Sequence, residues 1–551
     1  MNSIVIQYSL GTVFVFLACT LLTPPVLSRD LELASNGTTY YVSPSGNDSN
    51  PGTEAQPWPT IKKAADTLTA GDTVYIKAGT YQERVVPKNS GSSGNYITYA
   101  AYTDDTVIID GSNISLSSDL DGLFVVANKS YITISGLTVK NAGPNDNNAG
   151  IYVDSSSYIT IEKNYTYNTV SSGIGVWDSD HITIDGNEVD LACNDGEQEC
   201  ITVATTDTFE IKNNHVHHSG PGTLGGEGID VKDGSTNGKI YKNHVYYINR
   251  LGIYIDSWDK NTYNIEAYQN TVHDCADDGF TVAAESGGLL ENVKIYNNIV
   301  YSNTMNGICI SENGEAIYLH PMKNIYVVNN TFYNNGNSAW GGGVLIENPD
   351  AEEVVIRNNI CSQNVFSQIQ VEASVKNLTV DHNLIDGYRG YDTETYGNDY
   401  IEDDPLFVSA SGADFHLQGN SPAIDKGSSS DAPGADYEGN SRPYGSGYDI
   451  GAYEYGAGTG STTTALSTTT TVSSELCPTE EIYGERSAQT ELLRYFRDNV
   501  LSQSPKGQEM IRLYYEWGPV IVEMVNEDEE FKAQVKEMID GVLPLIRKEE
   551  E

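Results

Sequence analysis

The most regular feature of the chain is a set of short apolar stretches that end in asparagine. Within each stretch apolar and polar residues alternate with a period of two, as in "ITIDGNEV" and "VKIYNNIV", which predicts strands with one buried face. The asparagines recur every 24 to 32 residues and are Asn187, Asn214, Asn243, Asn270, Asn298, Asn330, Asn359 and Asn383. A repeat of this length, built from short strands without helical periodicity, predicts a solenoid.

We expect the repeated asparagines to stack inside the wall of this solenoid. Three strands and their turns fit in one repeat, and stacked coils bury a continuous Ile/Val core. A buried amide must find hydrogen-bond partners, which here would be the next asparagine and the backbone of the turn. The asparagines are therefore expected to be structural, with no catalytic role.

A second series of residues begins strands with glycine. These glycines are Gly150, Gly173, Gly228, Gly252, Gly279, Gly307 and Gly343. Counted from the glycine, positions +1 and +3 should point into the core and positions +2 and +4 outward. On three successive coils the outward side gathers acidic and aromatic residues. They are Asp230, Lys232, Asp233, Tyr254, Asp256, Trp258, Asp259 and Glu285, and the turn before the third coil adds Asp277 and Asp278.

Residues 122–390 resemble the right-handed parallel β-helix of the pectin-lyase-like superfamily. The stretch "YYVSPSGNDSNPGTEAQPWPTIKKAADTLTAGDTVYIKAGTYQERV", residues 40–85, is similar to the N-terminal segment of many such secreted proteins. "DDPLFV", "SPAID" and "YDIGAYEY", within 403–455, resemble a segment that follows these coils as a C-terminal cap. The resemblance implies the fold but leaves the function open, because this scaffold hosts lyases, hydrolases, epimerases and adhesins.

The predicted fold class is all-β: a right-handed parallel β-helix (solenoid) with an N-terminal capping helix, a C-terminal β cap and a separate small α-helical C-terminal domain. The capping helix, at about Pro59–Leu68, places Ile61, Ala64, Ala65 and Leu68 on one face, suited to closing the open end of the coil. The predicted parts are a signal peptide at 1–28, an N-terminal segment at 37–121, the β-helix at 122–390, the cap at 391–455, a Ser/Thr-rich linker at 456–474 and a helical module at 475–551.

The N-terminus carries an apolar run from Gly11 to Leu22 that is followed by prolines, which predicts a secretory signal ending near Ser28. The signal lacks the usual basic start, since no Lys or Arg precedes Arg29. An uncleaved membrane anchor is the alternative, because Ile4–Leu22 is 19 residues with few polar interruptions. Either way we expect a secreted or cell-surface protein.

Charge and cysteine content narrow the function further. The chain has 76 acidic and 31 basic residues, a net charge of −45, so nucleic acid is not an expected partner. The same charge repels polyanionic sugars unless a cation such as calcium lies between them. The cysteines show no zinc-binding spacing, and a Cys193–Cys200 disulfide is left open.

The acidic and aromatic residues of the outer face predict a carbohydrate site, in which aromatic rings pack on sugars and carboxylates act as acid and base. We expect Asp256 and Glu285, one coil apart, to carry glycoside hydrolysis without a cofactor, with Lys232 keeping Asp256 charged and Glu285 serving as the acid. "YIDSWD" followed by "VAAESGG" also resembles the Asp-then-Glu placement of some β-helix xylosidases. The remaining residues are assigned to sugar binding, namely Tyr254, Trp258, Asp230, Asp233 and Asp259.

Three alternatives remain. "CADDGF", Cys275–Phe280, resembles a stretch of one pectate lyase family, which implies a calcium-dependent polyuronate lyase with Asp277 and Asp278 on the metal and Lys232 as base. The sequence departs from that pattern at Thr281, where a further Asp is expected nearby, and in "NGICISENG", which has no Lys. The second alternative is a non-catalytic surface protein that binds glycans, and the third is a solvated acidic face with a Lys232–Asp256 ion pair.

The expected partner is a polysaccharide, bound by a monomer whose C-terminal module contacts the cell surface or another protein.

Proteolytic cleavage within 460–472 should release a soluble helical fragment, because the Ser/Thr-rich composition of the linker predicts an unstructured tether. Circular dichroism of the fragment and polysaccharide assays of the remainder test this division. Loss of activity from the remainder would contradict it.

Overall fold

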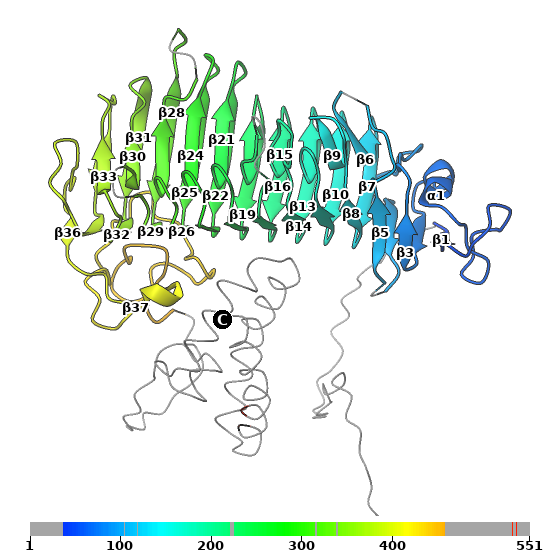
Figure 1. Cartoon of the computed structure of the whole chain (residues 1–551). Helices are drawn as coiled ribbons and strands as arrows, with labels where there is room; N and C mark the ends of the chain where they lie inside the picture. The colour runs from blue at the N-terminus through cyan, green and yellow to red at the C-terminus, as the bar shows by residue number, and fades with distance from the viewer. Residues whose placement is uncertain are drawn as a thin grey trace, which may run out of the picture.

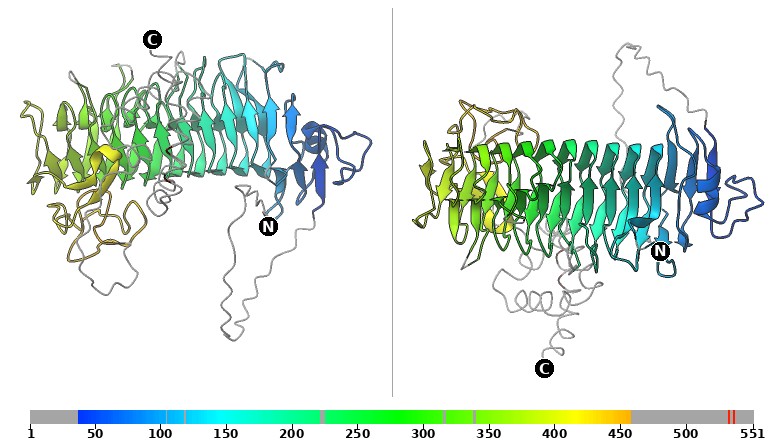
Figure 2. Two further views of the ribbon diagram at one scale, coloured as in Figure 1. Left: turned by 60° about the horizontal axis from the view of Figure 1, so that its bottom comes forward. Right: turned by 90° about the horizontal axis from the view of Figure 1, so that it is seen from above.

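The computed structural model describes residues 37–457, except 104, 118, 221–224, 315–316 and 338–339, together with Lys532 and Lys536. The described residues form an elongated coil of parallel strands (Figure 1, Figure 2), which confirms the predicted solenoid. The predicted signal peptide, linker and helical module fall outside them, apart from the two lysines. Within the described part of the chain, no helix is both long and apolar enough to span a bilayer.

Three parallel sheets form the walls of the coil. Sheet 1 contains Thr39–Val42 (β1), Thr73–Ile76 (β2), Ile97–Ala101 (β4), Ser130–Ser135 (β7), Ser157–Glu162 (β10), Asp180–Asp185 (β13), Asp207–Lys212 (β16), Thr236–Tyr241 (β19), Thr262–Tyr268 (β22), Leu290–Tyr296 (β25), Met322–Val328 (β28), Ala351–Arg357 (β31) and Thr379–Asp381 (β34). Sheet 2 contains Gly79–Tyr81 (β3), Val107–Asp110 (β5), Thr138–Lys140 (β8), Tyr165–Tyr167 (β11), Glu188–Asp190 (β14), His215–His217 (β17), His244–Tyr246 (β20), Thr271–His273 (β23), Ile299–Tyr301 (β26), Thr331–Tyr333 (β29), Ile360–Ser362 (β32), Leu384–Asp386 (β35) and Ile401–Glu402 (β36). Sheet 3 contains Asp121–Ala127 (β6), Asn148–Asp154 (β9), Ile174–Trp177 (β12), Ile201–Ala204 (β15), Ile229–Lys232 (β18), Ile253–Ser257 (β21), Phe280–Ala284 (β24), Ile308–Ser311 (β27), Gly342–Ile346 (β30) and Ser367–Val371 (β33).

The parallel pairing starts well before residue 122, where the sequence pattern placed the first coil. β1 pairs with β2, β2 with β4, and β4 with β7, so sheet 1 is continuous from Thr39 onward. These first strands alternate apolar and polar residues but lack the phased asparagine, which is why the repeat did not reveal them. Sheet 3 alone begins close to the predicted boundary, with β6.

The core is built from the alternate residues predicted to point inward. Ile229, Val231, Ile253 and Ile255 have no exposed surface, and they belong to one apolar cluster that runs through the coil. A glycine precedes these strands because the coil is tight there. A Cβ added to Gly252 would lie 2.6 Å from the carbonyl oxygen of Gly279.

The asparagine ladder is confirmed and begins one coil earlier than predicted, at Asn164. At each rung the backbone N–H and the side-chain amide of one Asn donate to the Oδ1 of the next. For Asn270 both donors lie 3.0 Å from Asn298 Oδ1, and Nδ2 also donates to the carbonyl of Ile240 at 2.9 Å. The ladder therefore satisfies every polar atom of a buried amide while it joins adjacent coils.

The residue before each ladder asparagine has a left-handed backbone. Gln269, for example, has φ of 55° and Asn297 has φ of 51°, and each lies between a strand of sheet 1 and the following strand of sheet 2. Asparagine tolerates this conformation better than most residues. In the recurring "NN" pairs the first asparagine has the left-handed backbone of the turn, and the second forms the hydrogen bonds of the ladder.

The helix Ile61–Thr67 (α1) closes the N-terminal end of the coil (Figure 1), as predicted. Ile61, Ala64 and Ala65 are buried in the same apolar cluster as the strands. Thr60 caps the helix, and the carboxylate of Glu83 accepts from the N–H groups of Ile61 at 2.9 Å and Lys62 at 2.7 Å. With the N–H of Lys63, which donates to Thr60 Oγ1, three free N–H groups of the first turn are satisfied.

The C-terminal segment differs in position from the predicted cap. It contains the antiparallel strands Phe407–Ser409 (β37) and Asp414–Leu417 (β38), with the short 3₁₀ helix Ala410–Gly412 (η1) between them. The segment packs on the outside of sheet 2 (Figure 1), where Ile299, Ile360 and Leu384 face outward and join its apolar residues in a second cluster. These outward apolar side chains explain why the segment covers the side of the coil.

The cysteines left open as a disulfide are free thiols. Cys193 and Cys200 are both buried, and the Sγ of Cys193 donates to the carbonyl of Gln198 at 2.7 Å. Burial and the neighbouring Cys200 raise the pKa of the Cys193 thiol, so it stays protonated. The loop between them is held by this hydrogen bond.

Replacing Asn270 with Leu should lower the free energy of unfolding by about 1–3 kcal/mol, because it leaves buried polar groups of the neighbouring rungs without partners. Denaturant unfolding measures the change. Asn261→Leu is the control, since Asn261 is exposed and accepts one hydrogen bond, from the N–H of Leu289. Equal losses in the two variants would contradict a special role for the ladder.

Candidate active site

A groove of about 570 Å³ runs along the outer face of sheet 3, across the strands from β15 to β30. Ten acidic and two basic residues line it. They are Glu197, Glu199, Glu227, Asp230, Asp233, Asp256, Asp277, Asp278, Glu285 and Glu347, with Lys232 and Arg250. Tyr254 and Trp258 also line the groove, so it contains every residue predicted for the site except Asp259, which is exposed on the turn beyond Trp258.

The register of sheet 3 explains why the groove forms here. Asp256 pairs with Ala283, which pairs with Ser311, so the side chains beside Asp256 on the next two coils are small. Tyr254 pairs with Asp230 on one side and with Thr281 on the other. Large polar side chains therefore stand next to short ones, and the space above the short ones stays open.

The outward-facing residues are more buried than the sequence suggested. Asp256 is 4% exposed and Asp230 is 1% exposed, whereas Trp258 is 50% exposed. Residues of the segments that flank the strands, such as Glu199, Asp278 and Asn313, line the groove beside them. Asp230 and Asp256 consequently lie on the floor of the groove, and Trp258 stands on its rim.

Lys232 pairs with residues other than the predicted Asp256. Its Nζ lies 2.6 Å from Glu199 Oε1 and 3.5 Å from Asp230 Oδ2. Burial opposes the charge of Lys232, but the charges of Glu199 and Asp230 raise its pKa well above the usual value, so it remains an ammonium. The second cation of the groove, Arg250, pairs with Glu227 at 3.1 Å.

Glu285 and Tyr254 form a hydrogen bond in which the phenol donates to the carboxylate. Glu285 is fixed at its backbone as well, since its N–H donates to the carbonyl of Ser257 at 2.8 Å. Asn313 lies at the other side of the phenol, with Nδ2 3.5 Å from its oxygen. The carboxyl group and the backbone of Glu285 are thus both held in place by hydrogen bonds.

Asp256 has the opposite environment. Its Oδ1 is buried and has no hydrogen-bond partner among the described residues. Burial first, and then the charge of Glu285, raise the pKa of Asp256 well above its usual value, and Lys232 opposes the shift without cancelling it. The expectation that Lys232 keeps Asp256 charged is therefore corrected: the lysine is engaged by Glu199 and Asp230, and burial dominates.

The pair Asp277 and Asp278, predicted as metal ligands, is divided between two environments. Asp278 is buried, and its Oδ1 accepts from the backbone N–H of Asn306 at 2.7 Å and from its side-chain amide at 2.8 Å. Its Oδ2 accepts from Thr281 at 3.0 Å, and burial raises the pKa of Asp278 to about 7. A cation at Asp278 would have to replace these bonds, and Asp277 is only half-buried.

Sequence reasoning missed the acidic wall of the groove formed by Glu199 and Glu227. Each stands two residues before its strand, at the same register position as Asp278 and Asn306. Burial and the charge of Glu199 raise the pKa of Glu227 to about 7. Extending the strand register two residues backward would have found this row.

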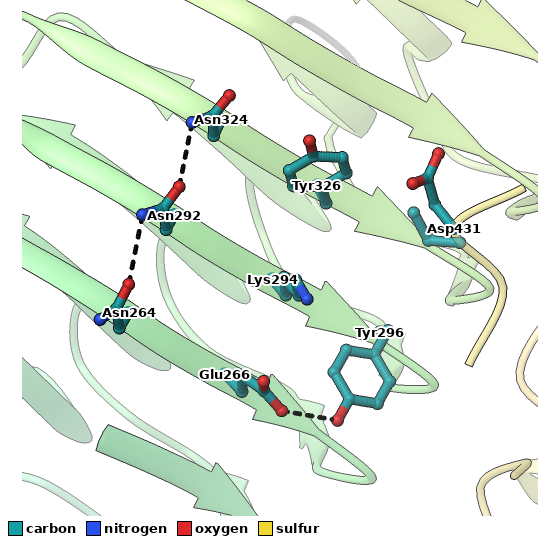
Figure 3. A pocket seen from close by; sticks show the side chains of 9 residues that line it. Asn264, Glu266, Asn292, Lys294, Tyr296, Asn324, Tyr326 and Asp431 are labelled. Carbon is teal, nitrogen blue, oxygen red and sulfur yellow. Dashed lines mark hydrogen bonds between the residues drawn. The ribbon is translucent and has the colours of Figure 1, made fainter. Parts of the chain in front are cut away.

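A second hollow lies on the outer face of sheet 1, near the loop that carries Asp431 (Figure 3). Its asparagines bond to one another, with Asn292 Nδ2 3.2 Å from Asn264 Oδ1 and Asn324 Nδ2 3.0 Å from Asn292 Oδ1. Glu266 accepts from the phenol of Tyr296 at 3.0 Å. Because these groups satisfy each other, this hollow is a weaker candidate for chemistry than the groove of sheet 3.

Comparisons with known proteins agree with the observed fold. Residues 40–193 match a family model described as Pel9A-like, right handed beta helix region, and residues 194–321 match one described as right handed beta helix region. The chain is 29% identical over 440 residues to the uncharacterized protein YwoF of Bacillus subtilis (strain 168), which is 70% of this chain and 92% of YwoF. It is 31% identical over 173 residues to pectate lyase PEL9 of Emericella nidulans, 29% of this chain and 38% of PEL9.

Among solved structures, the complex of XylC with xylose is similar, with a TM-score of 0.50 and 14% sequence identity over 76% of this chain and 98% of XylC. This likeness concerns the fold. Taken with the three sheets of parallel strands, the matches show that the chain belongs to the right-handed parallel β-helix proteins of the pectin-lyase-like superfamily.

Proposed function

We propose that the groove of sheet 3 is the active site of a glycoside hydrolase that cleaves an uncharged polysaccharide. The observation that carries the proposal is the contrast between two neighbouring carboxyl groups, Asp256 and Glu285. One is buried with an unpartnered oxygen, and the other accepts a hydrogen bond from Tyr254. A glycosidase needs one protonated and one ionised carboxyl group on either side of the bond it cleaves.

Asp256 is the acid in this mechanism. Its raised pKa keeps a proton on the carboxyl group, and that proton passes to the glycosidic oxygen as the bond from this oxygen to the anomeric carbon breaks. The roles are thus reversed from those expected from sequence.

Glu285 is the carboxylate in this mechanism, and its hydrogen bond from the phenol of Tyr254 holds it in position. It either bonds to the anomeric carbon or takes a proton from the attacking water, and the configuration of the released sugar distinguishes these two courses.

The binding of the sugar falls to residues around this pair. The half-exposed indole of Trp258 on the rim offers a flat apolar surface for a sugar ring. Asp230 and Asp233 line the groove and can accept hydrogen bonds from sugar hydroxyls. Asp259, which is exposed beyond Trp258, would contact only a longer chain.

The charge of the groove favours an uncharged substrate. Its ten carboxyl groups face two cations, and both cations are already paired with carboxylates. A polyuronate would be repelled from such a surface unless calcium intervened. In the described residues the groove carboxylates do not form a cluster of three ligand atoms close enough to share one ion.

The second candidate function is a calcium-dependent polyuronate lyase, which the similarity to pectate lyase PEL9 favours. The Pel9A-like match, however, ends at residue 193, before the first residue of the groove, Glu197. The likeness therefore concerns the scaffold beside the site more than the site itself.

Secretion or surface display, and contact of the C-terminal module with the cell surface or a partner, remain part of the proposal.

Asp256→Asn and Glu285→Gln should each reduce turnover of the cleaved polysaccharide by about 10²–10⁴-fold, because each removes one half of the acid–base pair. A screen of plant and algal polysaccharides that follows reducing ends identifies the substrate and measures the rate. Binding of the sugar should survive in both variants. Glu291→Gln on sheet 1 is the matched control and should leave the rate unchanged.

A rate unchanged by Asp256→Asn would sink the assignment of the acid. If the protein binds polysaccharide but releases neither reducing ends nor unsaturated products, it is a glycan-binding protein without hydrolase activity.

Lys232→Gln separates hydrolysis from elimination. In the hydrolase the charge of Lys232 lowers the pKa of Asp256, so its removal should move the alkaline limb of the pH–rate profile to higher pH and keep activity. EDTA should have little effect. In a lyase the same variant would be inactive, EDTA would abolish the reaction, and the products would absorb as unsaturated uronates.

A further inference from the structure

Sheet 2 carries a group of histidines on a different face of the solenoid from the groove, which lies on sheet 3. Asp190 of β14 pairs in register with His217 of β17, and His218 follows directly. The Nδ1 atoms of His217 and His218 lie 2.7 Å apart. Asp190 Oδ1 is 3.4 Å from the first of these nitrogens and 3.9 Å from the second.

The turn after β17 brings the two consecutive histidines to the same side. In a continuing strand their side chains would point to opposite faces. His218 instead has a left-handed backbone, with φ of 52°, which turns its ring toward the ring of His217. Three atoms that commonly bind metals thus form one triangle, contributed by two adjacent coils.

We infer that Asp190, His217 and His218 form a binding site for a divalent transition-metal ion, with zinc as the best-fitting ion. Zinc bonds imidazole nitrogen and carboxylate oxygen at about 2.0–2.2 Å, which places two ligands of a tetrahedral site about 3.3 Å apart. The three observed separations of 2.7, 3.4 and 3.9 Å bracket that value.

The groups around the triangle orient its members as in known metal sites, where a ligating histidine donates its other nitrogen to a carboxylate. The Nε2 of His217 lies 3.4 Å from Glu188 Oε1, which leaves Nδ1 for the ion. The phenol of Tyr165 donates to Asp190 Oδ2 at 3.0 Å, which leaves Oδ1 for the ion. Tyr246 stacks on the ring of His217, with centroids 5.0 Å apart.

His217 is buried, whereas His218 and Asp190 are partly exposed, so an ion could enter from solvent and keep a water as fourth ligand. The ion would join the coil of β14 to the coil of β17. Its binding energy would add to the stability of the folded coil, because the ligands converge only when the coils are stacked. This inference is independent of the hydrolase proposal, since the site lies on another sheet.

Zinc titration of the full chain, first stripped with EDTA and then dialysed free of it, tests the site. Isothermal calorimetry should show one zinc per chain, and zinc should raise the melting temperature. His218→Ala should abolish both effects or weaken binding at least tenfold, and because His218 is partly exposed the variant should still fold. Glu188→Gln should weaken zinc binding by about 10–100-fold while the three ligands remain.

His181→Ala is the matched control. His181 is an exposed histidine on sheet 1 that contacts Asp180, and its loss should leave zinc binding unchanged. Absence of stoichiometric zinc binding in the unaltered protein, or equal binding in His218→Ala, would overturn the inference. Circular dichroism of each variant shows whether the coil is intact.

Discussion

The stacking of buried asparagine amides is the interaction on which the rest of this molecule depends. A solenoid has few contacts between distant parts of its sequence, so each coil must be fixed to the next by local bonds. Here the amide of each ladder residue holds both the next amide and the carbonyl of an adjacent strand, as Asn270 does with Asn298 and Ile240. The strands of sheet 3 keep their register because this corner of the coil is fixed, and the groove residues depend on that register.

The groove concentrates acidic residues, and those on its floor are buried. Burying charged carboxylates is unfavourable, and two features of the groove reduce this cost. Lys232 lies within ion-pair distance of Glu199 and Asp230, and Arg250 pairs with Glu227. Burial also raises the pKa values of Asp230, Asp256 and Glu227, so protonation reduces the negative charge of the floor. In the proposed hydrolase, the proton that burial keeps on Asp256 is the one passed to the glycosidic oxygen.

Much of the fold could be predicted from the sequence, because period-two alternation and phased asparagines report local geometry that recurs on every coil. The first coils escaped because β1, β2 and β4 lack the asparagine, and the position of the C-terminal segment depended on outward apolar residues such as Ile299. At the site, alternation found Asp230, Tyr254 and Asp256. Alternation could not predict that Lys232 bonds to Glu199. The two residues are 33 positions apart, and Glu199 lies before its strand, where the alternation does not extend.

The C-terminal segment has a consequence for how the coil comes apart. Its backbone accepts hydrogen bonds from Gln269, Asn297 and Asn329, which belong to three successive coils. A solenoid whose coils touch only their neighbours can fray one coil at a time from its end. A segment fastened across several coils removes that freedom, because the last coils cannot leave until the segment itself detaches. This half of the protein is therefore built to unfold as one cooperative unit.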